Sequence, residues 1–227
     1  MVSSSLSSLT RLRALRLSWG PLVAAVCLIG LFSLLAGEVS VAETMWLDAR
    51  VLQLAQSLRQ HHPEFANVMR ELSGLGSTIV LTMLTVTTAG YLWTSGRIAK
   101  AVVLCAAMAS GAIAMSALKL FFGRVRPDLA MAAFAQDGMS YPSGHATMSA
   151  IFFLTVGTLL AQMHSSARVR AYLIGVAGLL SLSIGFSRMA LGVHWATDVL
   201  GGWAFGAGWA FLWFRATRSS WETLRST

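Results

Sequence analysis

The sequence predicts an all-α membrane protein: a polytopic helical bundle of six transmembrane helices, with short interfacial helices between the first two. Of its 227 residues, 56% are hydrophobic and only 11% are charged, whereas soluble domains carry about 25% charged residues. Charge-free runs recur along the chain, and they approach the roughly 20 residues that a helix needs to cross a bilayer. Lysine and arginine gather in alternate loops, which is typical of multi-pass membrane proteins.

Charge and cysteine content narrow the class of function. The formal net charge of +8 does not indicate a nucleic-acid partner, because no basic run interleaved with aromatic residues occurs. Excess positive charge in a membrane protein more often marks its cytoplasmic side. Cys27 and Cys105 both lie within apolar runs, so neither a disulfide nor a metal site is expected from them. Since the loops are short, we expect one membrane domain covering residues 1–227.

The first expected span covers residues 17–37, which contain no charged residue. It follows a serine-rich segment, residues 1–16, that carries three arginines and no acid. A signal peptide also starts with basic residues, but the apolar run here exceeds the roughly 7–15 residues of a signal peptide's hydrophobic part. We therefore expect a retained first helix, preceded by a cytoplasmic N-terminus.

Residues 38–75 are mixed in charge and contain two short amphipathic patterns. Apolar residues recur at helical spacing on either side of His61-His62-Pro63, and the proline predicts a break between two helices. Adjacent histidines can indicate a metal site, but no partner ligands occur at metal spacing, which favours an exposed break. We interpret the segment as two interfacial helices that lie over the outer surface of the bilayer.

Five further charge-free runs complete the predicted bundle. They cover residues 72–96, 101–118, 146–163, 171–187 and 199–214. The later runs are slightly shorter than a full span. We therefore expect these helices to continue through polar residues, which would lie in their terminal turns.

The distribution of charge predicts the orientation of the bundle. With the N-terminus inside, the inner loops and tails receive ten of the seventeen lysines and arginines but only one of the nine acids, Glu222. This positive-inside bias predicts cytoplasmic termini in a plasma (inner) membrane. The loops after the third and fifth spans then lie on the extracytoplasmic, periplasmic-type face.

Polar residues with catalytic potential cluster at this outer face. In chain order they are Lys119, Arg126, Ser143, Gly144, His145, Arg188, His194 and Asp198. Because the spans come in pairs between these positions, all of them fall on one side of the membrane. Single members have simpler explanations, since a cation at a helix end can be an interface anchor and a Pro-Ser-Gly sequence can be an ordinary turn. These explanations weaken when all the residues share one face.

His194 and Asp198 form the centre of the cluster. They are four residues apart, which in a helix would place both side chains on one face. A carboxylate beside an imidazole holds the ring in one tautomer and raises its basicity, which prepares a histidine to attack phosphorus. His145 follows a helix start and is placed to protonate a leaving oxygen.

The basic residues suit a phosphoryl group. Lys119, Arg126 and Arg188 can surround its equatorial oxygens and stabilise the charge of the transition state. Pro142-Ser143-Gly144 at a helix start offers free backbone N–H groups and the positive end of the helix dipole. Arg124 is expected to face water, as loop arginines usually do. Carboxylates near the basic cluster are too few for a two-metal site, so a metal-free mechanism is expected.

Three motifs in this order resemble the signature of the type 2 phosphatidic acid phosphatase (PAP2) family. They read Lys119-x6-Arg126-Pro127, Pro142-Ser143-Gly144-His145 and Ser187-Arg188-x5-His194-x3-Asp198. The motifs span residues 119–198, and the six-span layout extends the likeness to most of the chain. Membrane members of the family are lipid phosphate phosphatases, and soluble relatives include vanadium haloperoxidases.

The resemblance implies a role for each signature residue. His194 would form a phosphohistidine intermediate with the help of Asp198, and His145 would act as the general acid. The implied phosphate-binding residues are Lys119, Arg126, Ser143, Gly144 and Arg188. The family requires neither a metal nor another cofactor. The implied partners are the bilayer and a lipid phosphate, with undecaprenyl diphosphate, phosphatidylglycerophosphate and phosphatidate as the candidate substrates.

Other classes of function remain open at this point. A lipid phosphotransferase would use the same residues but pass the phosphoryl group to a second lipid instead of water. A non-catalytic lipid-binding or transport protein fits less well, because a binder needs cations but no nucleophile with an orienting acid. A vanadate-dependent haloperoxidase shares the site pattern, but six membrane spans argue against it.

Overall fold

The computed structural model describes residues 26–37 and 46–224, and this part of the chain is helical, without a strand. Its elements are the helix Val26–Gly37, α2 (Trp46–His61), α3 (Pro63–Gly74), α4 (Thr78–Thr94), α5 (Ile98–Phe122), the short 3₁₀ helix η1 (Leu129–Met131), α6 (Gly144–Ala161), α7 (Ala167–Ala190) and α8 (Ala196–Leu224). The expected cytoplasmic segment 1–16, the first part of the span 17–37 and the signal-peptide alternative lie outside the described residues.

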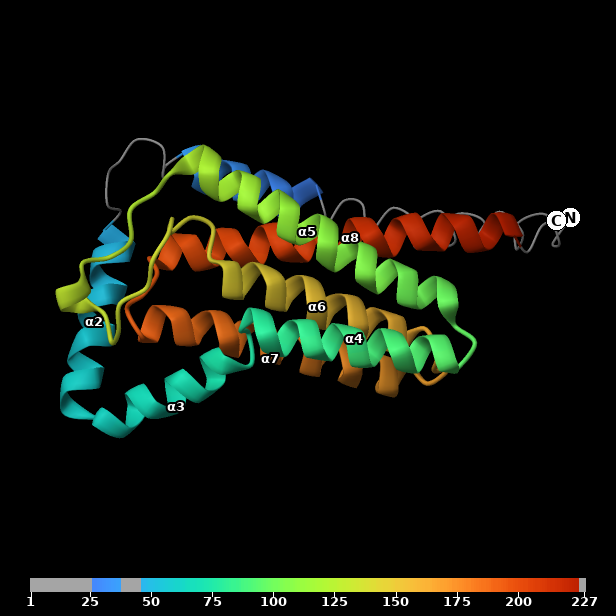
Figure 1. Cartoon of the computed structure of the whole chain (residues 1–227), viewed down its shortest axis with the longest axis horizontal. Coiled ribbons are helices and arrows are strands. Elements are labelled where there is room, and N and C mark those ends of the chain that lie inside the picture. The colour runs from blue at the N-terminus through green and yellow to red at the C-terminus, as the bar shows by residue number, and fades with distance from the viewer. Residues whose placement is uncertain (1–25, 38–45, 225–227) are drawn as a thin grey trace, which may run out of the picture.

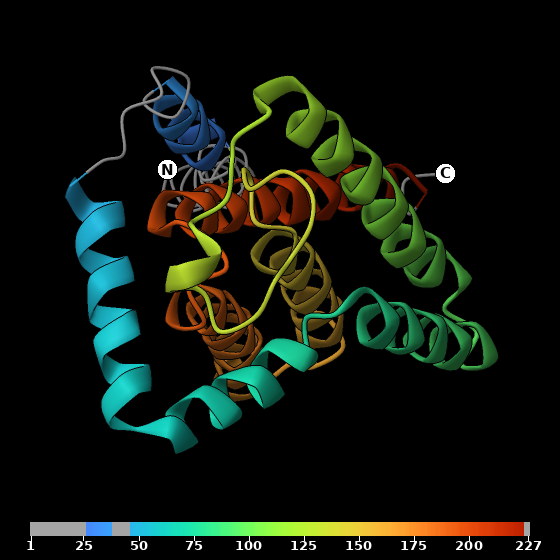
Figure 2. The ribbon, with the colours of Figure 1, turned by 60° about the vertical axis from the view of Figure 1, so that its left-hand side comes forward.

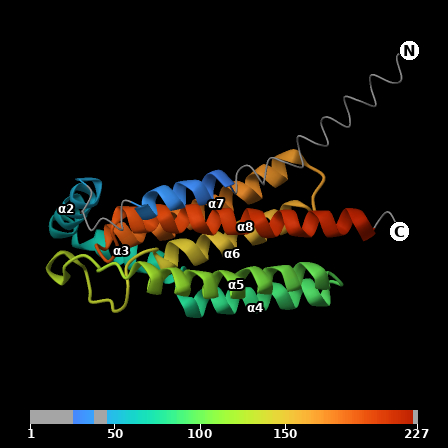
Figure 3. The same ribbon diagram turned by 90° about the horizontal axis from the view of Figure 1, so that it is seen from above.

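The long helices run side by side along the longest axis of the molecule, and α2 and α3 turn across one end (Figures 1 and 3). Figure 2 shows that end: α2 and α3 border it on two sides, and the long connection between α5 and α6 crosses it. The break between the two short helices lies at the expected place, because α2 ends at His61 and α3 begins at Pro63. Their position over the outer bilayer surface stays a prediction.

The membrane class is confirmed, whereas the number of spans stays a prediction. Within the described residues, α5, α6 and α7 are each long and apolar enough to cross a bilayer, and α3 with α4 forms a further candidate that bends by 40°. The predicted span 72–96 begins too early, because residues 72–74 belong to α3. The helix α4 starts only at Thr78, after Ser77, whose Oγ accepts a hydrogen bond from the Val80 N–H at 3.3 Å.

The helix α6 is the centre of the bundle, with ten buried residues along its length. Two glycines of α8 allow α8 to approach it closely. A Cβ on Gly202 would lie 2.9 Å from the carbonyl oxygen of Ser143, and a Cβ on Gly206 would lie 2.8 Å from the Cβ of Ala150. Side chains at these positions would therefore push the helices apart. The close approach brings the first turn of α6 next to the first turn of α8.

Candidate active site

The eight residues predicted to form the site lie at the same end of the bundle, although four helices and two connections supply them. Lys119 is in the last turn of α5, Arg126 follows α5, and Arg188 is in the last turn of α7. Ser143 is the N-cap of α6, followed by Gly144 and His145. His194 lies in the connection before α8, and Asp198 is in the first turn of α8. A direct hydrogen bond from Ser143 N to Asp198 O, at 3.0 Å, joins the starts of α6 and α8.

The Asp198 carboxylate orients the ring of His194. Its Oδ2 lies 3.2 Å from His194 Nδ1 and accepts hydrogen bonds from the Trp195 N–H at 2.9 Å and from Ser140 Oγ. Trp195 is the residue before α8 and Asp198 is the third residue of the helix, so the Trp195 contact is the reciprocal half of a capping box. One carboxylate thus fixes both the helix start and the imidazole.

The expected helical relation between His194 and Asp198 was wrong in detail. His194 lies in the connection that follows Gly192, a glycine with φ of +69°, and not in α8. The two side chains meet because this connection turns the histidine back over the first turn of the helix. Gly192 suits this turn because a left-handed φ costs glycine no Cβ clash.

The other ring nitrogen of His194 faces a cation. Arg126 Nη1 lies 3.0 Å from Nε2 and also donates to the Val193 carbonyl oxygen at 2.8 Å. Since Nδ1 carries the proton donated to Asp198, the lone pair lies on Nε2, where it accepts the hydrogen bond from Arg126. Burial, together with the charges of Arg126 and Arg188, lowers the pKa of His194 to about 4 against the opposing effect of Asp198. The ring is therefore neutral near pH 7, the state that a nucleophile requires.

Two buried polar atoms at the site have no hydrogen-bond partner among the described residues: Arg188 Nε and Ser143 Oγ. Arg188 is only 2% exposed, and its two other nitrogens donate to Ser73 Oγ at 2.6 Å and to Gln136 Oε1. Lys119 Nζ donates to the Met139 carbonyl oxygen at 2.6 Å. Buried donors normally have partners, so the two unpartnered atoms are suited to an anion.

Sequence reasoning missed several residues of the site, and it misplaced Arg124. This side chain does not face water: it is 11% exposed and lies between Asp198 and Asp48. Asp48 is fully buried on α2, within the mixed segment whose role the sequence did not indicate. One signal was present, because Asp48, Leu52 and Ala55 follow helical spacing and form the buried face of α2.

Ser140, Gln136 and Ser73 were also missed, since they belong to no recognisable motif. All three accept or donate hydrogen bonds to residues that were predicted. Ser73 reaches the site from the end of α3, and the other two lie in the connection between α5 and α6. The predicted site residues are thus held by side chains from segments that the motifs do not include.

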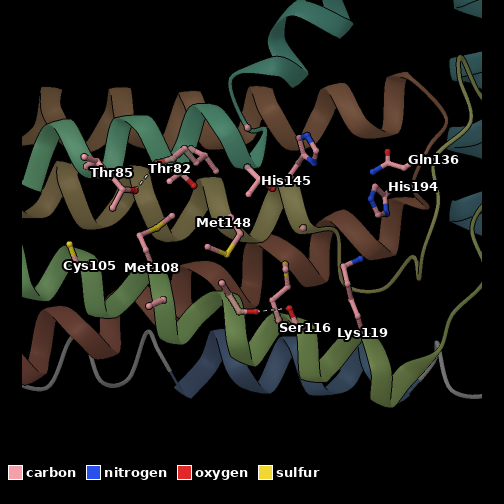
Figure 4. Close-up of a pocket in the computed structure, with 18 of the residues that line it drawn as sticks. Thr82, Thr85, Cys105, Met108, Ser116, Lys119, Gln136, His145, Met148 and His194 are labelled. Carbon is pink, nitrogen blue, oxygen red and sulfur yellow. Dashed lines mark hydrogen bonds between the residues drawn. The ribbon is translucent and has the colours of Figure 1, made fainter.

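A cavity of about 650 Å³ extends from the site between α4, α5 and α6. Its polar end is formed by Lys119, Arg126, His145 and His194, and its apolar part continues to Val86 and Cys105. Figure 4 shows Lys119, His145 and His194 toward one end of the cavity and Cys105 toward the other. A second cavity of about 600 Å³ shares Cys105 and Ala109 with the first and reaches Trp93 and Thr94. Together they follow α4 over about 24 Å, at 1.5 Å per residue.

An apolar cavity that ends at a neutral histidine among cations suits a membrane phosphatase that acts on lipids. Sequence comparison agrees with this class: the PAP2 superfamily matches residues 100–222. The chain belongs to this superfamily. It is an integral membrane phosphatase, a hydrolase of phosphoric monoesters, as its relatives are.

Two curated relatives are lipid phosphatases. Phosphatidylglycerophosphatase B of Bacillus subtilis (strain 168) is 28% identical over 184 residues, which cover 80% of this chain and 88% of the relative. Lipid A 1-phosphatase of Rhizobium johnstonii is 33% identical over 104 residues, which cover 42% of this chain and 38% of the relative.

Two solved structures share the fold. The crystal structure of the transmembrane PAP2-type phosphatidylglycerolphosphate phosphatase from Bacillus subtilis matches with a TM-score of 0.78 and 25% identity, covering 86% of this chain and 96% of that one. The structure of LpxE from Aquifex aeolicus matches with a TM-score of 0.60 and 25% identity, covering 76% and 98%. The predicted family, the helical membrane fold and the phosphatase class are confirmed. The roles of individual residues stay predictions.

Proposed function

We propose that the protein hydrolyses a phosphate or diphosphate lipid through a phosphohistidine intermediate on His194. One observation carries the proposal: His194 Nδ1 is held by Asp198 at 3.2 Å, while Nε2 faces Arg126 at the polar end of an apolar cavity. A lipid in this cavity would present its phosphate to a lone pair whose direction is already fixed, and Arg126 would turn its N–H from Nε2 to a phosphate oxygen.

In the first step, Nε2 of His194 attacks phosphorus and the bond to the leaving oxygen breaks. The leaving oxygen takes the electron pair of that bond and a proton from His145. The negative charge of the bound phosphate favours the protonated form of His145. Asp198 stabilises the positive ring that forms, in the manner of a triad carboxylate.

The phosphate is proposed to be bound by three cations and by the start of α6. Lys119, Arg126 and Arg188 offset the charge of its oxygens, and Arg188 Nε and Ser143 Oγ supply donors that have no partner among the described residues. The backbone of Gly144 lies at the positive end of the α6 dipole. In the second step, water attacks phosphorus, His145 accepts the proton of the water, and the P–Nε2 bond breaks. Its electron pair returns to Nε2 of His194, and inorganic phosphate is released.

The substrate class follows from the shape of the cavity and from the relatives. An apolar channel along α4 and α5 suits a long hydrocarbon chain, because burying that chain in the channel is favourable. Phosphatidylglycerophosphatase B matches over most of its length, so phosphatidylglycerophosphate is the first lipid to test. Phosphatidate and undecaprenyl diphosphate are the other candidates.

The proposed orientation has both termini in the cytoplasm and the site on the extracytoplasmic face. It rests on the excess of lysine and arginine in the loops at the opposite end. A reporter fused after Thr227 should be cytoplasmic. Activity at this position of a reporter that functions only outside the cytoplasm would contradict this orientation.

Substitution of His194 tests the mechanism directly. In detergent-purified full-length protein, His194→Ala should reduce phosphate release by more than about 10³-fold, because the nucleophile is lost. When the parent protein is denatured during turnover of a substrate labelled in its phosphate, it should carry a labelled phosphoryl adduct. The variant should lack this adduct. His61→Ala is a matched control, since His61 is exposed at the end of α2. Turnover of His194→Ala close to that of the parent would rule out this mechanism.

A panel of single purified lipids then defines the reaction. Free phosphate released from one lipid with no second acceptor identifies a hydrolase, whereas activity only with an added acceptor lipid identifies a phosphotransferase. We expect turnover to persist in a chelator, because cationic side chains supply the positive charge that the phosphate requires. Loss of activity in the chelator and recovery with a divalent ion would contradict this expectation.

A further inference from the structure

Arg124 lies between two buried carboxylates. Its Nη1 donates to Asp198 Oδ1 at 2.6 Å, and its Nη2 donates to Asp48 Oδ2 at 2.7 Å. Both carboxylates are fully buried, and the guanidinium carbon lies 5.5 Å from the centre of the Trp195 ring. The carboxylate that orients His194 therefore also faces a full positive charge through its second oxygen.

Asp48 holds this arrangement in place from the short helix α2. Besides Arg124, it accepts hydrogen bonds from the Thr197 N–H at 2.9 Å and from Thr197 Oγ1 at 2.8 Å. Thr197 is the second residue of α8, so Asp48 caps the helix that carries Asp198. The helix α2, which crosses the end of the bundle in Figure 1, thus reaches the site through the buried charge of Asp48.

The charges of Asp48, Arg124 and Asp198 together determine how Asp198 acts on His194. With Asp48 present, Arg124 is offset and the network keeps one net negative charge. Without Asp48, Arg124 would offset Asp198 itself. A phosphorylated imidazole that keeps its Nδ1 proton is positively charged, and a nearby carboxylate stabilises it only as far as that carboxylate is not already neutralised.

We propose that Asp48 is a positioning residue for the reaction: it neutralises Arg124, so that the charge of Asp198 remains available to His194. This role rests on the phosphohistidine mechanism proposed above. It assigns α2 a part in the chemistry, although no residue of α2 lines the cavity that holds His194.

The first test removes the charge of Asp48 and then restores the balance. Asp48→Asn keeps an oxygen that can cap α8. We expect kcat to fall on the order of 10- to 100-fold, by analogy with removal of a hydrogen-bond partner that orients a metal-bound histidine. KM should change less, because the network does not contact the lipid. Adding Arg124→Gln returns the net charge to that of the parent. The double variant should therefore have a higher kcat than Asp48→Asn alone.

The second test measures how kcat/KM depends on pH. The fall of kcat/KM at low pH, its acid limb, reports protonation of His194 in the enzyme without substrate. The charged and titratable groups that face His194 are Asp198 from α8, Arg188 from α7, Lys119 from α5, His145 from α6, and Arg124 and Arg126 from the connection after α5. In Asp48→Asn the uncompensated Arg124 disfavours the imidazolium, so the pKa of His194 falls and the limb moves to lower pH. Arg124→Gln should move it to higher pH.

Two controls separate charge from structure. Thr197→Val removes hydrogen bonds to Asp48 and Arg124 without changing charge, so its acid limb should coincide with that of the parent. Glu64→Gln makes the same kind of charge change on α3, where the side chain is 75% exposed, and should leave kcat unchanged. Thermal unfolding of each variant shows whether it is folded.

The outcomes are distinct. If the double variant is no more active than Asp48→Asn and the acid limbs do not move, Asp48 is only a structural cap and the inference is overturned. Should Asp48→Asn not fold, Arg124→Gln alone decides, because an acid limb that stays in place contradicts the charge role. Failure of the mechanism itself is recognised separately, since the parent then carries no phosphoryl adduct on His194.

Discussion

The two ring nitrogens of His194 lie in opposite kinds of environment. On the Nδ1 side, Asp198 is held by hydrogen bonds from Ser140, Trp195 and Arg124. On the Nε2 side, beyond Arg126, the space is a cavity, and the nearby Arg188 Nε lacks a partner among the described residues. One side is complete before any ligand binds, and the other offers donors that a ligand would satisfy. This contrast indicates that orientation of the histidine is fixed by folding, whereas recognition is completed by the substrate.

The largest effect is expected from substitution of Asp198, on the Nδ1 side of His194. Asp198→Asn should lower kcat by about 10³- to 10⁴-fold, because an amide no longer selects the tautomer or stabilises the positive ring. Phosphate should still bind on the Nε2 side of His194, so the inhibition constant for inorganic phosphate should change only a few-fold. Asp128→Asn, which alters an exposed N-cap of η1, is the matched control. Equal losses in turnover and in phosphate inhibition would show that the two sides are not separable.

A smaller effect is expected from substitution of Arg188, on the Nε2 side of His194 where the phosphate would bind. Arg188→Lys keeps the charge but removes Nε and the planar fork. Loss of one hydrogen bond to a charged group costs about 1.5–3 kcal/mol, so binding of the phosphate should weaken about 10- to 100-fold. The measurement is the inhibition constant for inorganic phosphate together with KM. Weakened inhibition by phosphate would sharpen the comparison, and an unchanged inhibition constant would contradict it.

The smallest effect concerns the cavity far from the phosphate. Cys105 lines both cavities, and Cys105→Trp would fill the space where they meet. Turnover of long-chain lipid phosphates should fall several-fold, while short-chain analogues should react as with the parent. Ile113→Trp is the matched control on the same helix, because Ile113 is 72% exposed and lines neither cavity. Equal turnover of both chain lengths by Cys105→Trp would show that the tail does not pass Cys105.

The sequence predicts the helical membrane class and the gathering of the motif residues, because hydropathy and charge distribution depend on composition over whole segments. Helix boundaries were less accurate: the span 72–96 was expected to start in what is α3, since residues on both sides of Gly76 and Ser77 are apolar. The place of His194 outside α8 also escaped prediction. Spacing of four residues suggested a helix, but Gly192 reverses the chain just before it.

Asp48 shows why part of the site could not be predicted. Its partners Arg124 and Thr197 are 76 and 149 residues away in the chain, and no local pattern relates positions at such distances. An acid in a segment of mixed charge is usually solvated. Only the docking of α2 against the start of α8 turns this aspartate into a buried counter-charge. Arg124 was misassigned for the same reason, because its partners are tertiary contacts.

The glycines of α8 have a consequence for how the enzyme responds to its membrane. Changes in bilayer thickness are accommodated by tilting of helices. Because Gly202 and Gly206 seat α8 directly on α6, we expect these two helices to tilt as one unit, so that the first turns that carry His145 and Asp198 keep their separation. The helix α4 has only three buried residues, so we expect it to adjust instead. Lipid composition should therefore change how easily a chain enters beside α4 and leave the chemistry at the head group unaltered.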